Sequence, residues 1–161
     1  MHLPEVSLTL VQLTDDDLAA MLRGDDAVRP GIAQPPGGVD APAVLAHVRR
    51  MRVGHPEGHW MMVAGGEAVG LCGIKARPSP HGDVEIGYGV AASRRRRGHA
   101  TAAVTALVEN AQHIGGIQTI VACTTLDNLA SQRVLERNGF KRTGRRPDPD
   151  DGELIVWRKR L

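Results

Sequence analysis

The run of arginines from Arg94 to Arg97, followed by Gly98, is the part of this sequence whose residue types most directly suggest chemistry. An apolar run typical of a strand, residues 84–90, precedes it, and a helical pattern over residues 98–113 follows it. Free backbone N–H groups and the positive end of the helix dipole converge at such a junction, and arginines attract diphosphates. The sequence therefore predicts a phosphate-binding loop. The alternative is a basic surface loop that binds nothing.

The composition is that of one globular domain, which we place at residues 1–161. Of the 161 residues, 42% are hydrophobic and 24% are charged, and the net charge of +2 gives no overall field for nucleic acid or membranes. Aromatic side chains are too scarce for a platform that stacks single-stranded nucleic acid. The N-terminus does not resemble a signal peptide and no apolar run reaches the length of a membrane span. We therefore expect a cytoplasmic protein with no nucleic-acid or membrane partner.

Neither the cysteines nor the histidines form a metal-binding pattern. Cys72 and Cys123 each lie inside an apolar run typical of a strand, so we expect both to be reduced, buried and inert. In the segment from His55 to His59, a proline and a glycine prevent the helix that would place two histidines on one face. The sequence predicts no metal site.

The order of predicted elements is that of a mixed α/β domain with a mostly antiparallel sheet. We expect one parallel pair of neighbouring strands around the helix that follows the arginines, and a glycine hairpin at residues 65–66. Residues 25–38 are predicted to form a loop. The expected strands are residues 6–13, 59–64, 68–75, 83–90, 118–124 and 153–158, with a short one near Lys141, and the expected helices are 14–24, 41–53, 98–113 and 128–138.

Several residues are predicted to begin or end these helices. Thr14 and Asp40 have side chains that can accept hydrogen bonds from the first backbone N–H groups of the helices that follow them. Gly139 is the predicted left-handed residue after the fourth helix, which would let Phe140 fold back on Leu135. These signals predict where the expected helices begin and end.

Three segments, which follow one another along the chain at residues 85–90, 95–100 and 128–140, resemble the GNAT superfamily of acetyl-CoA-dependent N-acetyltransferases. Residues Arg95 to Ala100 match the family's pyrophosphate loop, (Gln/Arg)-x-x-Gly-x-(Gly/Ala), and Glu85 to Val90 is similar to its fourth strand, which splays to admit the cofactor. The block from Asn128 to Phe140 is most similar to the branch that includes the ribosomal-protein-alanine acetyltransferases RimJ and RimL. The resemblance implies the GNAT fold, α/β (α+β), with a mixed, mostly antiparallel central sheet of six to seven strands flanked by about four helices.

The resemblance implies acetyl-CoA as a co-substrate, with no metal. The pyrophosphate would bind the backbone N–H groups of the arginine loop, and the pantetheine arm would lie along the end of the fourth strand. The backbone N–H of Val90 would then stabilise the oxyanion that forms at the thioester. Residues expected to contact the cofactor are Val90, Ala91, Ala92, Arg95, Arg96, Arg97, Gly98, His99, Ala100, Thr101, Asn128 and Ser131.

Glu85 is predicted to be the catalytic base or to organise a water molecule, because attack on a thioester needs a neutral amine and several family members place a glutamate near this position. The alternative is a structural carboxylate that pairs with a nearby arginine. Leu135 stands where many members have a tyrosine that protonates the departing thiolate, which leaves Ser131 as the candidate to hydrogen-bond the sulfur or as a plain helix residue. Tyr88 is expected on the opposite face of the strand from Glu85, as a core or cofactor-flanking residue.

The resemblance implies direct attack by an amine in a ternary complex. The candidate acceptors are a protein N-terminus, a polyamine, an amino acid and an aminoglycoside. Two other functions stay open: a non-catalytic acyl-CoA-binding sensor, which the missing helix tyrosine favours, and a nucleic-acid-binding domain that uses Arg94 to Arg97. The last strand could also pair across a homodimer.

Overall fold

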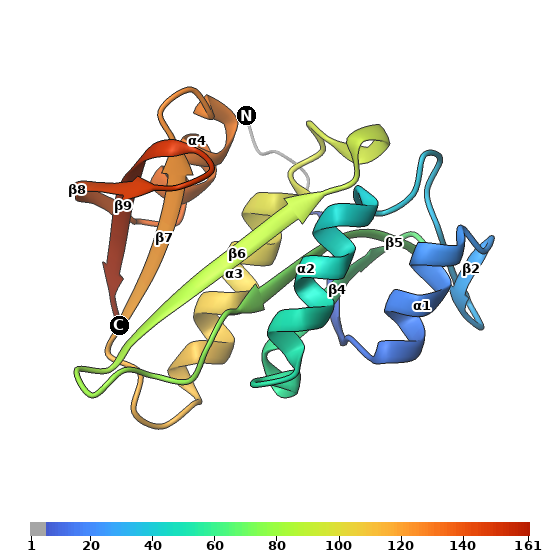
Figure 1. Ribbon diagram of the computed structural model, residues 1–161, viewed down its shortest axis with the longest axis horizontal. Coiled ribbons are helices and arrows are strands. Elements are labelled where there is room, and N and C mark those ends of the chain that lie inside the picture. The colour runs from blue at the N-terminus through green and yellow to red at the C-terminus, as the bar shows by residue number, and fades with distance from the viewer. Residues whose placement is uncertain (1–5) are drawn as a thin grey trace.

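In the computed structural model, which describes residues 6–161, a nine-stranded sheet runs through the whole molecule (Figure 1). Its main path has the order β1-β4-β5-β6-β7-β9-β8, and the small β2–β3 hairpin joins β5 beside this path. The strands are β1 (Thr9–Gln12), β2 (Ala27–Arg29), β3 (Ile32–Ala33), β4 (His59–Ala64), β5 (Glu67–Ile74), β6 (Asp83–Val90), β7 (Thr119–Thr125), β8 (Lys141–Asp148) and β9 (Gly152–Arg160).

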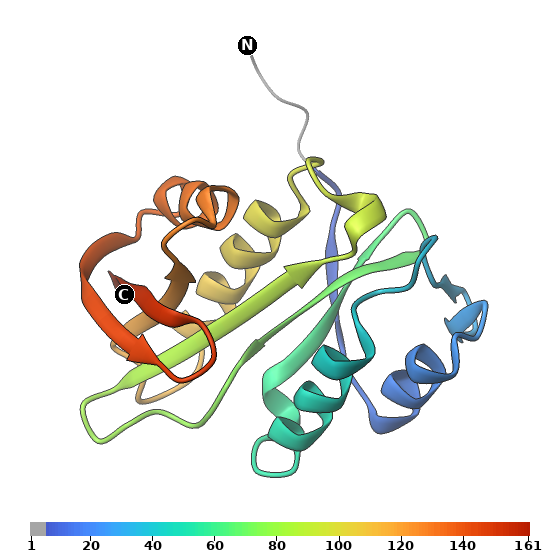
Figure 2. The ribbon, with the colours of Figure 1, turned by 45° about the horizontal axis from the view of Figure 1, so that its top comes forward.

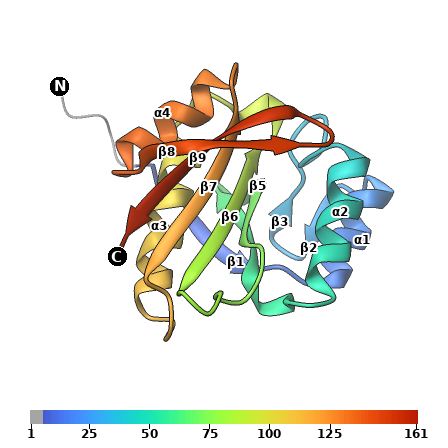
Figure 3. The ribbon, with the colours of Figure 1, turned by 60° about the vertical axis from the view of Figure 1, so that its left-hand side comes forward.

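Helices cover both faces of the sheet. Figure 3 shows α3 (His99–Gln112) and α4 (Leu129–Arg137) on one face, and α1 (Asp15–Arg23) and α2 (Pro42–Arg52) on the other. Each face buries its own apolar cluster, and the neighbouring residues Met61 and Met62 of β4 point into different clusters, as alternation along a strand requires. The mixed fold, the four α-helices and the mostly antiparallel sheet confirm the expected architecture.

The sheet has more strands than the six to seven expected. The predicted loop over residues 25–38 contains the β2–β3 hairpin, whose strands are too short to show a periodic pattern. The short strand expected near Lys141 is the eight-residue β8, in which all residues but the last are exposed. Backbone pairing with β9 holds this edge strand, so no apolar alternation could reveal its length.

The helix ends follow the predicted signals in two of three cases. Thr14 forms a reciprocal capping box with Asp17, as expected of the residue before α1. Gly139 has φ 80°, and the N–H of Phe140 donates to the carbonyl of Leu135 (3.0 Å), so the predicted close of α4 is confirmed. The prediction for Asp40 is wrong.

The residue before α2 is Ala41, which has no side-chain hydrogen bond to the helix. Pro42 at the first helical position needs no N–H partner and fixes the start one residue later than expected. The Asp40 carboxylate accepts a hydrogen bond from the adjacent Ala41 N–H (2.7 Å) and lies outside the helix. This places a carboxylate beside the end of β6, against Gly89.

Candidate active site

The site begins where two parallel strands stop pairing. β6 and β7 are joined only from Asp83 to Glu85 and from Thr119 to Val121, whereas β5 continues to pair with β6 as far as Val90. The second half of β6 therefore has no strand partner on its β7 side. This separation, the β6–β7 gap, confirms the expected parallel pair and resembles the splay expected from the sequence.

The backbone of Val90 faces the β6–β7 gap. The N–H of Ala91 donates to the carbonyl of Val69 on β5 (2.8 Å). Because alternate residues of an antiparallel strand turn their N–H and C=O groups to opposite sides, the groups of Val90 point away from β5. In agreement with this direction, Arg95 Nε donates to the carbonyl oxygen of Val90 (3.3 Å). A donor at the open end of β6 is thus aimed into the gap.

The arginine loop, residues 94–98, joins the end of β6 to α3 (Figure 2). Arg96 has φ 63° and is the only non-glycine residue with positive φ among residues 6–161. Gly98 has φ 82° and precedes α3 without a side-chain hydrogen bond to the first turn. The first N–H groups of α3, from His99 to Thr101, therefore have no side-chain cap and can bind an anion.

The four arginines do not share one role. Arg94 forms a two-pronged pair with Glu67 on β5 (2.8 and 3.0 Å), which anchors the loop to the sheet. Arg95 contacts the Val90 carbonyl, and Arg96 and Arg97 are exposed. His99 is 8% exposed, and burial lowers the pKa of its imidazole, so this residue offers its backbone rather than its side chain to an anion.

The first turn of α4 closes the gap on the α3–α4 face. Asn128 Oδ1 accepts from the N–H of Ser131 (3.1 Å), which confirms that Asn128 caps the helix and leaves its Nδ2 for a ligand. The phenol oxygen of Tyr88 lies 2.6 Å from Ser131 Oγ. Tyr88 thus points to the face opposite Glu85, as expected. Burial raises the pKa of Tyr88, against a smaller opposite effect of its hydrogen bond with Ser131.

Glu85 is held by two cations on the α1–α2 face. Its carboxylate lies 2.8 Å from Lys75 Nζ and 2.9 Å from an Arg146 guanidinium nitrogen of β8. Burial alone would raise the pKa of Glu85, but the bond and charge of Lys75, with Cys123 and Arg146, outweigh it and lower the pKa. The ionised form is therefore favoured, which weakens Glu85 as a direct proton acceptor. Sequence reasoning did not anticipate Arg146, because β8 was not recognised as a full strand.

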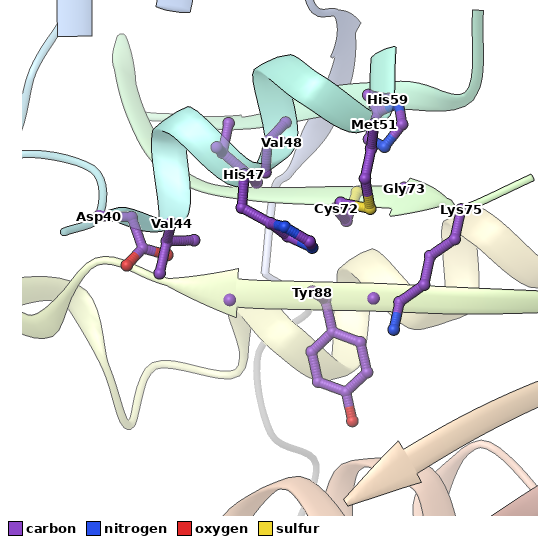
Figure 4. A pocket seen from close by; sticks show the side chains of 13 residues that line it. Asp40, Val44, His47, Val48, Met51, His59, Cys72, Gly73, Lys75 and Tyr88 are labelled. Carbon is purple, nitrogen blue, oxygen red and sulfur yellow. The ribbon is translucent and has the colours of Figure 1, made fainter. Parts of the chain in front are cut away.

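A hollow, the α2–β6 hollow, opens beside the gap and was not anticipated from the sequence. It has a volume of about 180 Å³, and glycines of β5 and β6 form its floor. Figure 4 shows Asp40 and His47 over β6 on one side and His59 and Lys75 at the other end. The signal that could have revealed it is the set of glycines on one face of two neighbouring strands: Gly73, Gly87 and Gly89.

A second hollow of about 270 Å³ lies between the segment before α2 and the end of β6. Val90, Ala92 and Arg95, three residues expected at the cofactor, contribute to its wall, and Asp40 borders both hollows. The structure thus brings Val90, Ala92 and Arg95 together at the end of β6, whereas Asn128 and Ser131 lie on α4. Glu85 lies five residues before Val90 on β6.

The cysteines differ in their surroundings. Cys72 is buried as expected, and burial raises the pKa of its thiol to about 12. Cys123 is only half-buried and its Sγ lies 3.3 Å from Glu85, so the prediction of a buried residue is wrong for it. Within residues 6–161, no three potential metal ligands form a group, and no helix is long and apolar enough to cross a membrane.

Relatives of known sequence match parts of this chain. A family model for the acetyltransferase (GNAT) domain matches residues 7–141. The uncharacterized N-acetyltransferase YjdG of Bacillus subtilis (strain 168) is 36% identical over 74 residues, which are 46% of this chain and 44% of that protein. YoaA, named in the same way and from the same strain, is 32% identical over 78 residues, 48% of this chain and 44% of its own. The matched segments span less than half of each relative.

Solved structures share the fold over nearly the whole chain. RimL, a ribosomal alpha-N-protein acetyltransferase in complex with coenzyme A, has a TM-score of 0.73 with 18% identity and covers 98% of this chain and 96% of its own. The aminoglycoside acetyltransferase AAC(6')-Ib in complex with coenzyme A has a TM-score of 0.70 with 22% identity, over 96% and 95%. With the fold, the separated strands and the family match over residues 7–141 in agreement, the chain belongs to the acetyltransferase (GNAT) domain family.

Proposed function

We propose that this protein is an N-acetyltransferase that moves an acetyl group from acetyl-CoA to a primary amine. The observation that carries the proposal is the β6–β7 gap, where the Val90 backbone faces the open side next to the uncapped first turn of α3. Two structural neighbours, RimL and AAC(6')-Ib, were solved with coenzyme A, which supports the same ligand here. The chain's own residues fit that ligand at each of its three parts.

The diphosphate would bind the N–H groups from Arg95 to Thr101, with Arg96 and Arg97 adding charge. Gly98 is required because a Cβ there would already lie 3.1 Å from Val6 Cγ2, and because φ 82° strains any L side chain. The pantetheine arm would run along Val90 to Ala92, within reach of Asn128 Nδ2. Acetyl-CoA supplies the activated thioester, whose carbonyl oxygen would accept from the Val90 N–H.

The amine reaches the protein mostly as an ammonium ion and must lose a proton before it attacks. We propose that Glu85 assists by holding a water molecule rather than by direct contact. Its ion pairs with Lys75 and Arg146 lower its affinity for a proton. From Glu85 to Gly89 the strand extends about 13 Å, which also places the carboxylate far from the Val90 end.

Ser131 is the proposed donor to the departing sulfur, with Tyr88 behind it. The Tyr88 phenol keeps its proton at neutral pH because burial raises its pKa, and it contacts Ser131 Oγ directly. Attack by the amine forms the carbon–nitrogen bond and the oxyanion, the carbon–sulfur bond breaks when this intermediate collapses, and the departing thiolate takes up one proton. Since the ammonium loses two protons in all, one proton is released for each acetyl group transferred.

The test is acetyl-CoA-dependent release of free thiol, measured with alanine- and serine-starting peptides, polyamines, amino acids and aminoglycosides. RimL and AAC(6')-Ib represent two of these acceptor classes. Turnover with one class establishes the enzyme and names its acceptor. Binding of acetyl-CoA without any turnover favours a non-catalytic sensor, and failure to bind acetyl-CoA contradicts the proposed function.

A further inference from the structure

The α2–β6 hollow has the construction of a binding site for a small molecule. Its floor exposes the backbone of Gly73, Gly87 and Gly89 beside the Leu71 side chain, and its roof is the face of α2 with Val44, His47, Val48 and Met51. The hollow has a volume of about 180 Å³ and is partly open to solvent. A small amine fits within it, and a larger molecule would have to extend through its open side.

Asp40 supplies a negative charge at the end of the hollow nearest Val90. Its Oδ2 lies 3.3 Å from the position that a Cβ on Gly89 would occupy, so the carboxylate rests directly on the floor. Within residues 6–161, no lysine, arginine or histidine lies within ion-pair distance of it, and its one hydrogen bond comes from the Ala41 backbone. An ammonium group bound here would lie beside the end of β6 that faces the proposed thioester.

His59 supplies a neutral polar group at the far end. The residue is 3% exposed, and within the described part of the chain neither ring nitrogen has a hydrogen-bond partner in good geometry. Burial lowers the pKa of His59, together with the charges of His55 and Arg52 and against an opposite effect of the His55 backbone, which favours the neutral ring. A buried imidazole without partners costs free energy unless a ligand completes its hydrogen bonds. The side chain lines the hollow, where such a ligand would lie (Figure 4).

We infer that the α2–β6 hollow binds a small primary amine of amino-acid size, whose ammonium contacts Asp40 and whose second polar group hydrogen-bonds His59. This inference rests on the proposed function for its meaning, because the bound amine would be the acetyl acceptor. The floor positions next to the two side chains, Gly89 and Gly73, are two residues and one strand apart, about 8 Å. The acceptor is therefore an amine whose second polar group lies several bonds away from the nitrogen.

Two amines of equal size test this assignment. Aminopentanol carries its amine and hydroxyl at opposite ends of five carbons, and hexylamine has a methyl group in place of the hydroxyl. We expect calorimetry to show about tenfold tighter binding of aminopentanol, because its hydroxyl forms one more buried hydrogen bond. A tenfold change in Kd corresponds to about 1.4 kcal/mol. Binding is measured with and without coenzyme A, so that the result does not depend on turnover.

Substitutions of Asp40 and His59 test which end of the amine each side chain contacts. Asp40→Asn should weaken both amines at least tenfold, whereas Asp26→Asn, an exposed carboxylate without ion pairs, should change neither. His59→Leu should abolish the preference for aminopentanol, and His59→Asn, which keeps hydrogen-bonding groups, should retain part of it. Thermal melting of each variant checks that the protein is folded.

A substitution in the floor tests independently where the amine binds. Gly87→Ala adds a methyl group 3.1 Å from Lys75 Cε inside the hollow and should weaken both amines, while Gly144→Ala, with open space around it, should not. Equal binding of the two amines by the wild type, an unchanged Asp40→Asn variant, or an aminoglycoside that binds more tightly than aminopentanol would overturn the inference. Failure of acetyl-CoA to bind would instead overturn the proposed function and leave the amine-binding result to be judged separately.

Discussion

The phenol oxygen of Tyr88 on β6 lies 2.6 Å from Ser131 Oγ at the start of α4, and this contact bridges the β6–β7 gap on the α3–α4 face. Leu135, one turn further along α4, is fully buried and offers no proton. We propose that the hydroxyl pair takes the place of the tyrosine that many family members carry in this helix. Such a proton donor would depend on the distance between β6 and α4.

Removal of the Ser131 hydroxyl tests this pair. We expect Ser131→Ala to lower kcat by roughly 10²-fold, within the range for loss of a general acid, and Tyr88→Phe to lower it less because Ser131 remains. A thioester with a more acidic thiol needs less help, so both variants should recover with it. The measurement is thiol release with the two donors. An unchanged kcat for Ser131→Ala would remove the pair from the mechanism.

Substitution of Glu85 separates direct base catalysis from the water-mediated role. Glu85→Gln keeps an acceptor oxygen and should lower kcat about tenfold, compared with about 10²-fold for loss of a direct base. Because the pKa of Glu85 is lowered by Lys75 and Arg146 against the effect of burial, its ionisation should not appear as a limb near neutral pH. Rates from pH 5 to 9 check this. The control is Glu153→Gln, because Glu153 also pairs with an arginine of β8.

The loop before α3 is tested by one added methyl group. Gly98→Ala should weaken acetyl-CoA binding at least tenfold in calorimetry, because φ 82° strains alanine and the new Cβ presses on Val6. Gly116→Ala is the matched control, since Gly116 has φ 87° and open space around it. It should show a similar backbone cost in melting temperature and no loss of acetyl-CoA binding. Equal loss in both variants would contradict a specific role for Gly98.

Asp17 links stability to pH. Burial would raise its pKa, but hydrogen bonds from Arg29 and Thr14 outweigh burial and hold the pKa below the usual 3.8. A carboxyl with a lowered folded-state pKa contributes stability above about pH 4, and this contribution is lost as the pH falls through the folded-state pKa. Asp17→Asn should lower the free energy of unfolding by about 2 kcal/mol at pH 7.

Urea unfolding at several pH values measures this effect. The difference between wild type and Asp17→Asn should shrink as the pH falls below about 4, because the wild-type carboxylate becomes protonated. Asp16→Asn is the control, since Asp16 stands in the same helical turn but is exposed and forms no hydrogen bond among the side-chain contacts of residues 6–161. A constant difference at all pH values would show that charge is not the cause.

The sequence was informative where one strand and one helix meet through a short loop. The apolar run of β6, the arginines and the helical period of α3 all lie within thirty residues, and local rules for turns and caps apply there. The close of α4 at Gly139 could be predicted for the same reason. The full length of β8 could not be predicted, because its polar residues are held by backbone pairing with β9 and follow no apolar alternation.

The partners of Glu85 and the α2–β6 hollow were also beyond sequence reasoning. Arg146 reaches Glu85 from 61 positions away, across two strands of the sheet, and no spacing rule connects them. Asp40 was interpreted through the helix that follows it, yet its carboxylate lies against Gly89 of β6. Contacts between distant elements depend on topology and register, which only the folded chain determines.

The glycine floor of the α2–β6 hollow limits how this protein can be redesigned. Gly87 and Gly89 already carry the smallest possible side chain, so every substitution at these two positions narrows the cavity and none can widen it. Room for a bulkier amine must come from truncation of larger lining residues such as Val44 and Met51 on α2 or Leu71 on β5. A library intended to broaden acceptor range should therefore randomise these positions and leave the strand glycines unchanged.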